Sequence, residues 1–356
     1  MSKSKGKRKA APAAPKKRRV TGAERQARKN VAKNSTIIFW ITAIILVLLF
    51  VGRWVVAIAN GYFGAFFQVD YSAASAVDNM KGRTPAGDDA DLLLPLEKRW
   101  DLFTASRLRD EVHTTADDGA ELHGYLYNEG AGVTVVVLPQ FYDDGTADFL
   151  PGEYLNELTG CNLLLPDPRC HGGSGGEYFS YGLTEQYDLA AWLRWADEAL
   201  GEQTYILWGT GTGANTALYA AANGLLPDSV AFLVAESPYA SLHEMAQAHI
   251  ARFYSVPAFP FLTAIEIKTN RSNTGFTVAD IDLAPVLSGS DAELPALFLL
   301  SASDAYILPA WSESVISLYP GPSETITDGT GHGTVYAAGQ SAVETLLADW
   351  WSRYGG

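Results

Sequence analysis

Apolar residues follow two different patterns along this chain of 356 residues. Residues 36–59 form one long apolar run that contains a single charge, Arg53. From residue 109 onward, short apolar runs alternate with longer segments of mixed polarity. About 20 apolar residues suffice for a helix to cross a bilayer, whereas alternating short strands and helices are typical of an α/β sheet. The pattern therefore predicts a transmembrane helix over residues 36–59, followed by an α/β domain.

The α/β segment is predicted to begin with a hairpin, because two strand-like stretches flank the turn Asp117-Asp118-Gly119. The strands after it are continuous apolar runs, as expected of a parallel sheet that is covered by helices on both faces. Strands are predicted at residues 133–138, 162–166, 204–208, 230–235 and 296–300, and helices at 184–200, 214–223 and 341–353. The predicted fold class is therefore α/β, with a mostly parallel sheet between two layers of helices.

Charge divides the chain at the apolar run. Residues 1–35 carry a net charge of +12, and the remainder carries −26. Basic residues beside a span favour the cytoplasmic side, so the N-terminus is predicted to be cytoplasmic and the main domain extracytoplasmic, at the cell membrane. The acidic domain is not expected to bind nucleic acid, because phosphate contacts require a basic surface. Residues 1–35 are poor in large apolar residues and are predicted to be a disordered tail.

Two other interpretations of this region are possible. Ala57-Ile58-Ala59 resembles the cleavage site of a signal peptide, but the length of the run and the position of Arg53 favour an uncleaved anchor. The basic stretch 15–20 resembles a nuclear import signal, and the positive-inside rule accounts for it better. Residues 60–96 are predicted to be a linker to a domain at 97–356. The two cysteines, Cys161 and Cys170, are predicted to be free thiols, because a strand separates them.

Three segments of the domain carry motifs. The loop after the second parallel strand reads Pro-Asp-Pro-Arg-Cys-His-Gly-Gly-Ser-Gly over residues 166–175. The next strand leads into Gly-Thr-Gly-Thr-Gly at 209–213. Further on, Asp304 lies in a Ser-Asp-Ala-Tyr turn, and His332 lies between two glycines. These segments resemble, in this order, the motifs of the α/β-hydrolase family, and they are most similar to its bacterial, membrane-anchored serine esterase and peptidase-like branch.

The resemblance implies a role for each motif. Residue 211 is at the nucleophile position of a sharp strand-to-helix turn, and Asp304 and His332 are the acid and the base of the triad, in the chain order expected of this fold. The oxyanion-hole positions are Phe141 and Thr212. The loop after the second parallel strand is implied to be structural through Asp167, Arg169, His171, Gly172 and Ser174. Residues 252–285 resemble a short cap, and Glu236 is a further acid near the site.

The chain departs from the family pattern at two places. The nucleophile position holds Gly211, which tolerates the conformation of the turn but offers no Oγ. After the first parallel strand, where the family usually has His-Gly, the chain has Pro139 and Gln140. The loss of one oxyanion donor can cost about 2–4 kcal/mol of transition-state stabilisation. Both departures remove parts that serine-dependent hydrolysis requires, the nucleophile and an oxyanion donor.

Two hypotheses follow. In the first, the domain is a degenerate serine hydrolase, a pseudoenzyme that binds a small apolar or ester-like ligand or acts as a scaffold. In the second, it is an active ester or amide hydrolase that uses another nucleophile, such as water activated by His332. The loss of serine and the altered oxyanion segment favour the first. The sequence predicts no cofactor and no metal motif, and the remaining histidines show no ligand spacing.

Overall fold

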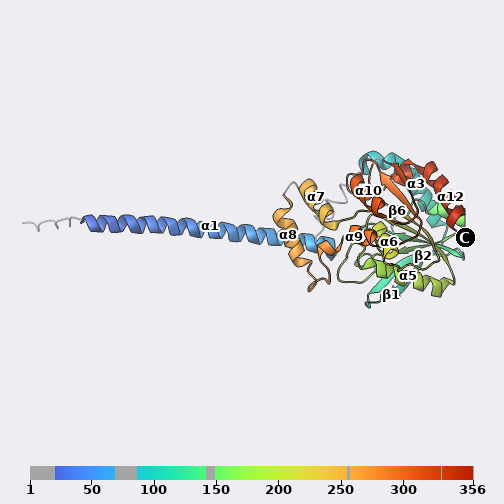
Figure 1. The fold of residues 1–356 in the computed structure, drawn as a ribbon, viewed down its shortest axis with the longest axis horizontal. Coiled ribbons are helices and arrows are strands. Elements are labelled where there is room, and N and C mark those ends of the chain that lie inside the picture. Colours follow the sequence, from blue (N-terminus) through green and yellow to red (C-terminus); the bar gives the residue numbers. More distant parts are fainter. Residues whose placement is uncertain (1–20, 69–85, 142–148, 255–256, 330, 356) are drawn as a thin grey trace, which may run out of the picture. The chain divides into compact units, whose positions relative to one another are not determined.

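The computed structural model describes residues 21–68, 86–141, 149–254, 257–329 and 331–355. The chain separates into two compact units, Met1–Trp54 and Val55–Gly356. The first unit consists of most of a long helix, and the second contains the sheet and the helices that cover it (Figure 1).

Helix α1 runs from Gly22 to Phe67 and begins at a capping box. The backbone N–H of Thr21 donates to the Glu24 carboxylate at 2.9 Å, and the Glu24 N–H donates to the Thr21 hydroxyl at 3.3 Å. This reciprocal cap stabilises the first turn, so residues 22–35 are helical and the prediction of disorder is wrong there; residues 1–20 lie outside the described residues. By length and composition α1 could cross a membrane, and no residue of its apolar window is buried in the structure.

The linker predicted over residues 60–96 is helical at both ends. Residues 60–67 complete α1, and helix α3 (Ala86–Ala105) begins well before residue 97. Phe63 and Phe67 are spaced by one helical turn and are buried in the second unit, as are Leu96 and Trp100 of α3. These apolar pairs supply the packing that the linker prediction overlooked. The middle of the predicted linker, residues 69–85, lies outside the described residues.

Eight strands form one sheet within the described ranges, in the order β1-β2-β4-β3-β5-β6-β7-β8. The strands β1 and β2 form an antiparallel hairpin that joins β4, and all later pairings are parallel. Their bounds are β1 Asp110–Thr115, β2 Glu121–Tyr127, β3 Val133–Leu138, β4 Asn162–Pro166, β5 Thr204–Thr210, β6 Val230–Glu236, β7 Ala296–Ser301 and β8 Ser323–Asp328. The predicted hairpin and the five predicted parallel strands are confirmed. The edge strand β8 was not predicted, because its sequence is mostly polar and none of its residues is buried.

Helices pack on both faces of the sheet (Figure 1). Along β3, Val136 and Leu138 point into one apolar cluster, and Val135 and Val137 point into the other. The first cluster contains α5 (Glu185–Leu200), α6 (Thr212–Ala222), α9 (Leu283–Ser288) and α10 (Pro309–Leu318). The second contains α3, α4 (Gly152–Thr159), α11 (Val335–Ala338) and α12 (Gln340–Tyr354). The predicted α/β architecture with two helical layers is therefore confirmed.

A third apolar cluster forms a cap beside the sheet. It joins the last turns of α1 to α7 (Leu242–Tyr254), α8 (Ala258–Lys268) and the short helix η2 (Val278–Asp280). The predicted cap thus exists, and it includes α1 residues that the sequence did not associate with it. Cys161 and Cys170 are both free, as predicted.

Candidate active site

The turn between β5 and α6 has the backbone of a nucleophile elbow. Gly211 adopts φ +53° and ψ −110° at the first step of α6, and its N–H donates to the Glu236 carbonyl oxygen at 2.8 Å. A Cβ on Gly213 would overlap the carbonyl of Leu138, so only glycine lets α6 approach the end of β3. A Cβ on Gly211 itself would meet only the Gln140 Cβ, at an ordinary 3.6 Å. The site therefore has room for a serine side chain, although the positive φ strains any residue other than glycine.

Asp304 and His332 meet at the carboxyl ends of β7 and β8. The His332 Nδ1 lies 2.7 Å from the Asp304 Oδ2. The other oxygen of Asp304 accepts the N–H groups of Tyr306 and Ile307 at 2.7 and 2.8 Å. Burial disfavours ionisation of Asp304, but the hydrogen bond and charge of His332, with these two N–H donors, lower its pKa below the ordinary value. The acid is thus an ionised, oriented partner of the imidazole.

The second nitrogen of His332 faces Gln140. Its Nε2 lies 2.6 Å from the Gln140 Oε1. With the amide in this orientation both ring nitrogens donate, so the ring is an imidazolium; with the amide turned over, its NH₂ would donate to a neutral ring. The Nε2 is hydrogen-bonded in either case. The sequence had indicated Gln140 only as a departure near the oxyanion hole, and its contact with His332 depends on how the loop after β3 folds.

The two predicted oxyanion-hole positions lie at the ends of neighbouring elements. Thr212 is the first residue of α6, and its buried Oγ1 has no hydrogen-bond partner among the described residues. Phe141 follows β3, and its ring packs on Phe179 and Tyr181 at centroid distances of 5.3 and 5.2 Å. The close packing of Gly213 on Leu138 brings these two chain segments together.

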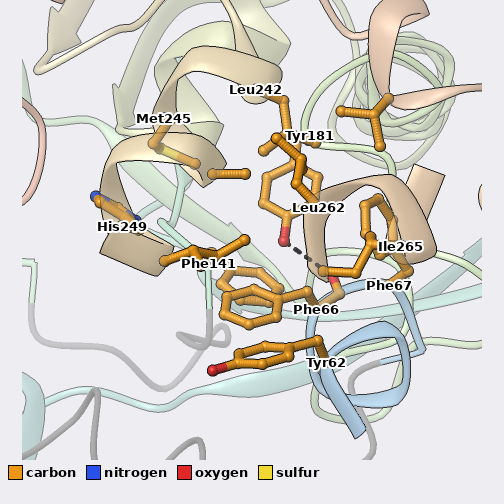
Figure 2. A pocket seen from close by; sticks show the side chains of 13 residues that line it. Tyr62, Phe66, Phe67, Phe141, Tyr181, Leu242, Met245, His249, Leu262 and Ile265 are labelled. Carbon is orange, nitrogen blue, oxygen red and sulfur yellow. Dashed lines mark hydrogen bonds between the residues drawn. The ribbon is translucent and has the colours of Figure 1, made fainter. Parts of the chain in front are cut away.

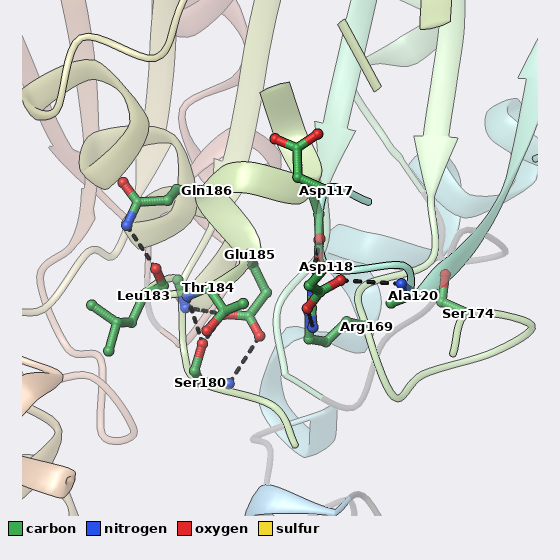
Figure 3. A network of polar contacts seen from close by, with 12 residues as sticks. Asp117, Asp118, Ala120, Arg169, Ser174, Ser180, Leu183, Thr184, Glu185 and Gln186 are labelled. Atoms are coloured by element: carbon green, nitrogen blue, oxygen red, sulfur yellow. Dashed lines mark hydrogen bonds and ion pairs between the residues drawn. The ribbon is translucent and has the colours of Figure 1, made fainter. Parts of the chain in front are cut away.

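Arg169 holds the loop after β4 to two other elements. Its guanidinium binds both oxygens of Asp188 at 2.9 and 2.6 Å and one oxygen of Asp118 at 2.7 Å. Figure 3 shows the Asp118 side of this network, next to the Ser180–Glu185 bonds that begin α5. Burial alone would lower the pKa of Arg169, but the hydrogen bonds and charges of Asp188 and Asp118 outweigh it and raise the pKa above its ordinary value. The guanidinium therefore stays protonated. Asp188 gave no sequence signal, because an acid in the first turn of a helix is ordinary.

The rest of this loop is closed by hydrogen bonds. Asp167 accepts the Gly173 N–H at 2.6 Å and contacts His123 at 2.5 Å. A Cβ on Gly172 would overlap the Asp167 carboxylate, which explains the glycine. The Ser174 hydroxyl donates to the Asp167 carbonyl at 2.8 Å. His171 is buried, with its Nδ1 2.9 Å from the Arg169 carbonyl oxygen. These contacts support the structural role that the sequence assigned to the loop.

Glu236 is a second buried acid near His332. Its Oε1 accepts the Val335 N–H at 3.4 Å, and its side chain is almost fully buried at the end of β6. Burial raises its pKa to about 7, although the charge of His332 acts in the opposite direction. Glu236 therefore adds a protonatable group beside the Asp304–His332 pair.

An apolar pocket opens beside these residues (Figure 2). About 570 Å³ of space, including solvent at its mouth, lies among side chains of the α1 end, α7 and α8. Phe66 of α1 stacks on Phe141 at 5.8 Å, and the Tyr181 hydroxyl donates to the Phe66 carbonyl oxygen at 3.0 Å. Its lining includes Tyr62, Phe66, Leu242, Met245, Ala246, Leu262 and Ile265. Polar groups are few, so the pocket suits an apolar ligand.

Comparison with known proteins identifies the family. The model of the alpha/beta hydrolase fold family matches residues 133–315, slightly more than half of the chain. The chain belongs to the α/β-hydrolase fold family. The uncharacterized protein YqkD of Bacillus subtilis is 30% identical to this α/β-hydrolase-fold chain over 165 residues, 46% of the chain and 52% of YqkD. The match thus spans about half the length of that relative.

Solved structures agree with this fold. The Pyrococcus furiosus esterase Pf2001 matches with a TM-score of 0.56 at 19% identity, covering 70% of this chain and 94% of that one. DcsB, solved in complex with a substrate analogue, matches at 0.51 and 18%, covering 69% and 99%. Est1E of Butyrivibrio proteoclasticus, solved with ferulic acid, matches at 0.50 and 15%, covering 68% and 98%. At these identities the likeness shows the fold of the α/β-hydrolase domain.

Proposed function

We propose that this chain is a membrane-anchored, extracytoplasmic α/β-hydrolase-fold protein that has lost serine catalysis and binds an apolar or ester-like ligand in the pocket of its cap. The observation that carries the proposal is the combination of Gly211 and Gln140. Gly211 offers no nucleophilic oxygen, and Gln140 occupies the Nε2 of His332, the atom to which a serine hydroxyl would donate in an intact triad.

The pocket supports a binding role. Its lining is almost wholly aromatic and aliphatic, and it adjoins the Phe141 end of the site. Two of the named relatives in the fold were solved with a ligand or an analogue, ferulic acid in Est1E and a substrate analogue in DcsB. A domain that keeps the pocket without the nucleophile retains the means to recognise a ligand without cleaving it.

The anchor and its orientation rest on α1. This helix contains an apolar stretch with few charged residues that is long enough to cross a bilayer. The basic residues precede it, which supports a cytoplasmic N-terminus and a hydrolase-fold domain outside. Ala59, Phe63 and Phe67, at the C-terminal end of the same helix, are buried in the cap cluster.

One observation favours the second candidate, an active hydrolase that uses water. The Asp304–His332 bond is intact at 2.7 Å, and Gly211 leaves space above the elbow. A water molecule activated by His332 needs the Nε2 atom as its base, and Gln140 holds that atom at 2.6 Å. The degenerate site is therefore the better supported of the two.

The two candidates are separated by turnover measurements on the full-length chain in detergent. A panel of nitrophenyl esters of increasing acyl length, and a fluorophosphonate probe of activated serines, would be applied to the unmodified protein and to His332→Ala. The degenerate site predicts no labelling and the same background rate for both proteins. Turnover by the unmodified chain that disappears in His332→Ala would establish the water mechanism and overturn the proposal.

A further inference from the structure

Three metal-binding side chains meet on the first hairpin of the sheet. His113 of β1 lies directly opposite His123 of β2 in the antiparallel register. Glu111 precedes His113 by two residues, so it projects from the same face of β1. One potential ligand atom from each of the three lies within 4.8 Å of the others. No metal motif is visible in the sequence, because only the register of the hairpin brings these two histidines side by side.

His123 is already held in the manner of a metal ligand. Its Nδ1 lies 2.5 Å from the Asp167 Oδ2, and the same carboxylate oxygen accepts the Gly173 N–H at 2.6 Å. A histidine that donates its Nδ1 hydrogen to a carboxylate has its lone pair on Nε2, the arrangement that orients metal-bound imidazoles in proteins. His123 is buried, so this orientation is fixed by packing as well as by the hydrogen bond.

The other two side chains are able to close around an ion. Glu111 and His113 are exposed and lie on β1, which is one of the two edge strands of the sheet. Opposed residues of an antiparallel pair have Cβ atoms about 4.5–5.5 Å apart, near enough for two imidazoles to reach one ion. Small rotations of the Glu111 and His113 side chains would thus bring their ligand atoms, with that of His123, to metal-bonding distance of one ion.

We propose that Glu111, His113 and His123 bind one divalent transition-metal ion, with Asp167 as the positioning residue behind His123. Two imidazoles and one carboxylate are a donor set that Zn²⁺ accepts, with water in the fourth position. A hard ion such as Mg²⁺ or Ca²⁺ prefers oxygen ligands and does not suit two imidazoles. The bound ion would join β1 to β2 and, through Asp167, to the loop after β4.

The test uses the full-length chain in detergent, purified without a polyhistidine tag and freed of metal with a chelator. Binding of ZnCl₂ is followed by calorimetry, and CoCl₂ is added as a spectroscopic probe of the ligand field. We expect one ion per chain and a visible Co²⁺ absorption band of low coordination number. His113→Ala should remove the band and weaken Zn²⁺ binding by about 100-fold or more, whereas Asp167→Asn should weaken it by about 10–100-fold, as is typical of an outer-shell partner.

Two variants make the outcome decisive. Glu111→Gln is exposed at the sheet edge and should fold normally, so a loss of affinity in it reports on the site rather than on stability. His243→Ala is the matched control, because His243 forms a half-buried histidine–carboxylate pair with Glu266 at 2.8 Å and has no third metal-binding side chain beside it among the described residues. Zn²⁺ binding that is unchanged by His113→Ala and Glu111→Gln, or equally reduced by His243→Ala, would overturn the proposal. Failure to bind one ion per chain would overturn it as well.

Discussion

The amide of Gln140 lies 2.6 Å from Nε2 of His332, on the opposite side of the ring from Asp304. The imidazole is therefore held at both nitrogens. The nearest atom to a Cβ built on Gly211 is the Cβ of Gln140, at 3.6 Å. Gln140 thus lies next to the elbow and occupies the Nε2 of His332, the atom to which a nucleophilic serine would donate. Glycine at position 211 and this contact of Gln140 are mutually consistent features of one site.

This relationship predicts how catalysis can be restored. Gly211→Ser supplies an Oγ, but Gln140 still competes for His332. Gly211→Ser combined with Gln140→Gly frees the Nε2, and general-base activation is typically worth about 10²–10⁴-fold in rate. We expect fluorophosphonate labelling of the double variant to be about 100-fold faster than that of Gly211→Ser alone. Labelling is measured by in-gel fluorescence against time.

The control for this experiment is the double variant with His332→Ala added, which should lose the labelling. Thermal unfolding of each variant identifies any loss of stability from the strained φ at position 211. Equal labelling rates for the single and double variants would show that Gln140 gives way to serine and does not block the base.

The sequence was sufficient for the sheet and for the order of the site residues. Strands such as β3 are buried on both faces, so they appear in the sequence as continuous apolar runs. The elbow was recognisable because Gly209 and Gly213 are required by close packing, independently of the residue at its apex. Asp304 and His332 were identified by their short motifs and are found 2.7 Å apart.

Contacts between distant segments were not predictable in the same way. Gln140 is 192 residues from His332 in the chain, and nothing in its local sequence indicates the bond. Phe66 resembles a continuation of the apolar span, yet its ring packs on Phe141. The pairing of His113 with His123 depends on strand register. Each of these features needs the tertiary structure, because single-sequence patterns report burial and periodicity rather than partners.

The buried acid Glu236 predicts a pH-dependent stability. Its pKa rises from the ordinary 4.5 to about 7 in the folded chain. At a pH between these two values, the folded protein keeps the proton on Glu236 and the unfolded protein has lost it. The contribution of neutral Glu236 is fully present below about pH 4.5 and is lost as the pH rises through about 7. Glu236→Gln stays neutral and should gain stability relative to the parent as the pH increases, on the order of 3 kcal/mol at pH 8.

Thermal unfolding of both proteins at pH 5 and pH 8 checks this expectation. The glutamine amide oxygen can still accept the Val335 N–H that Glu236 accepts at 3.4 Å, so packing changes little. A difference between the two proteins that is the same at both pH values would mean that Glu236 does not carry the buried proton.

The proposed topology predicts the pattern of proteolysis in intact cells. The basic residues precede the apolar part of α1, so the tail should be cytoplasmic and the hydrolase-fold domain exposed. Protease added outside should digest the domain and spare an epitope tag at the N-terminus. Permeabilised cells provide the control, in which the tag is also removed. Loss of the N-terminal tag from intact cells, with the domain protected, would reverse the orientation.

The cap pocket predicts a ligand with an apolar chain. The lining from α7 and α8 includes Met245, Ala246 and Leu262, and Phe66 and Tyr62 complete it. Each methylene that is buried contributes about 0.8 kcal/mol, so a variant that excludes two methylenes should lose about 1.6 kcal/mol, or about 15-fold in affinity. Ala246→Trp places a large side chain in the pocket from a half-buried position on α7.

Ligand binding is measured with a photoactivatable fatty ester added to the full-length chain in lipid nanodiscs, followed by mapping of the crosslinked peptides. We expect crosslinks to α7 and α8 that fall about 15-fold in Ala246→Trp. Ala251→Trp on the same helix is the matched control, because residue 251 is exposed and does not line the pocket. A bulky residue outside the pocket should leave binding unchanged. Similar crosslinking of both variants would therefore show that the fatty ester does not bind in this pocket.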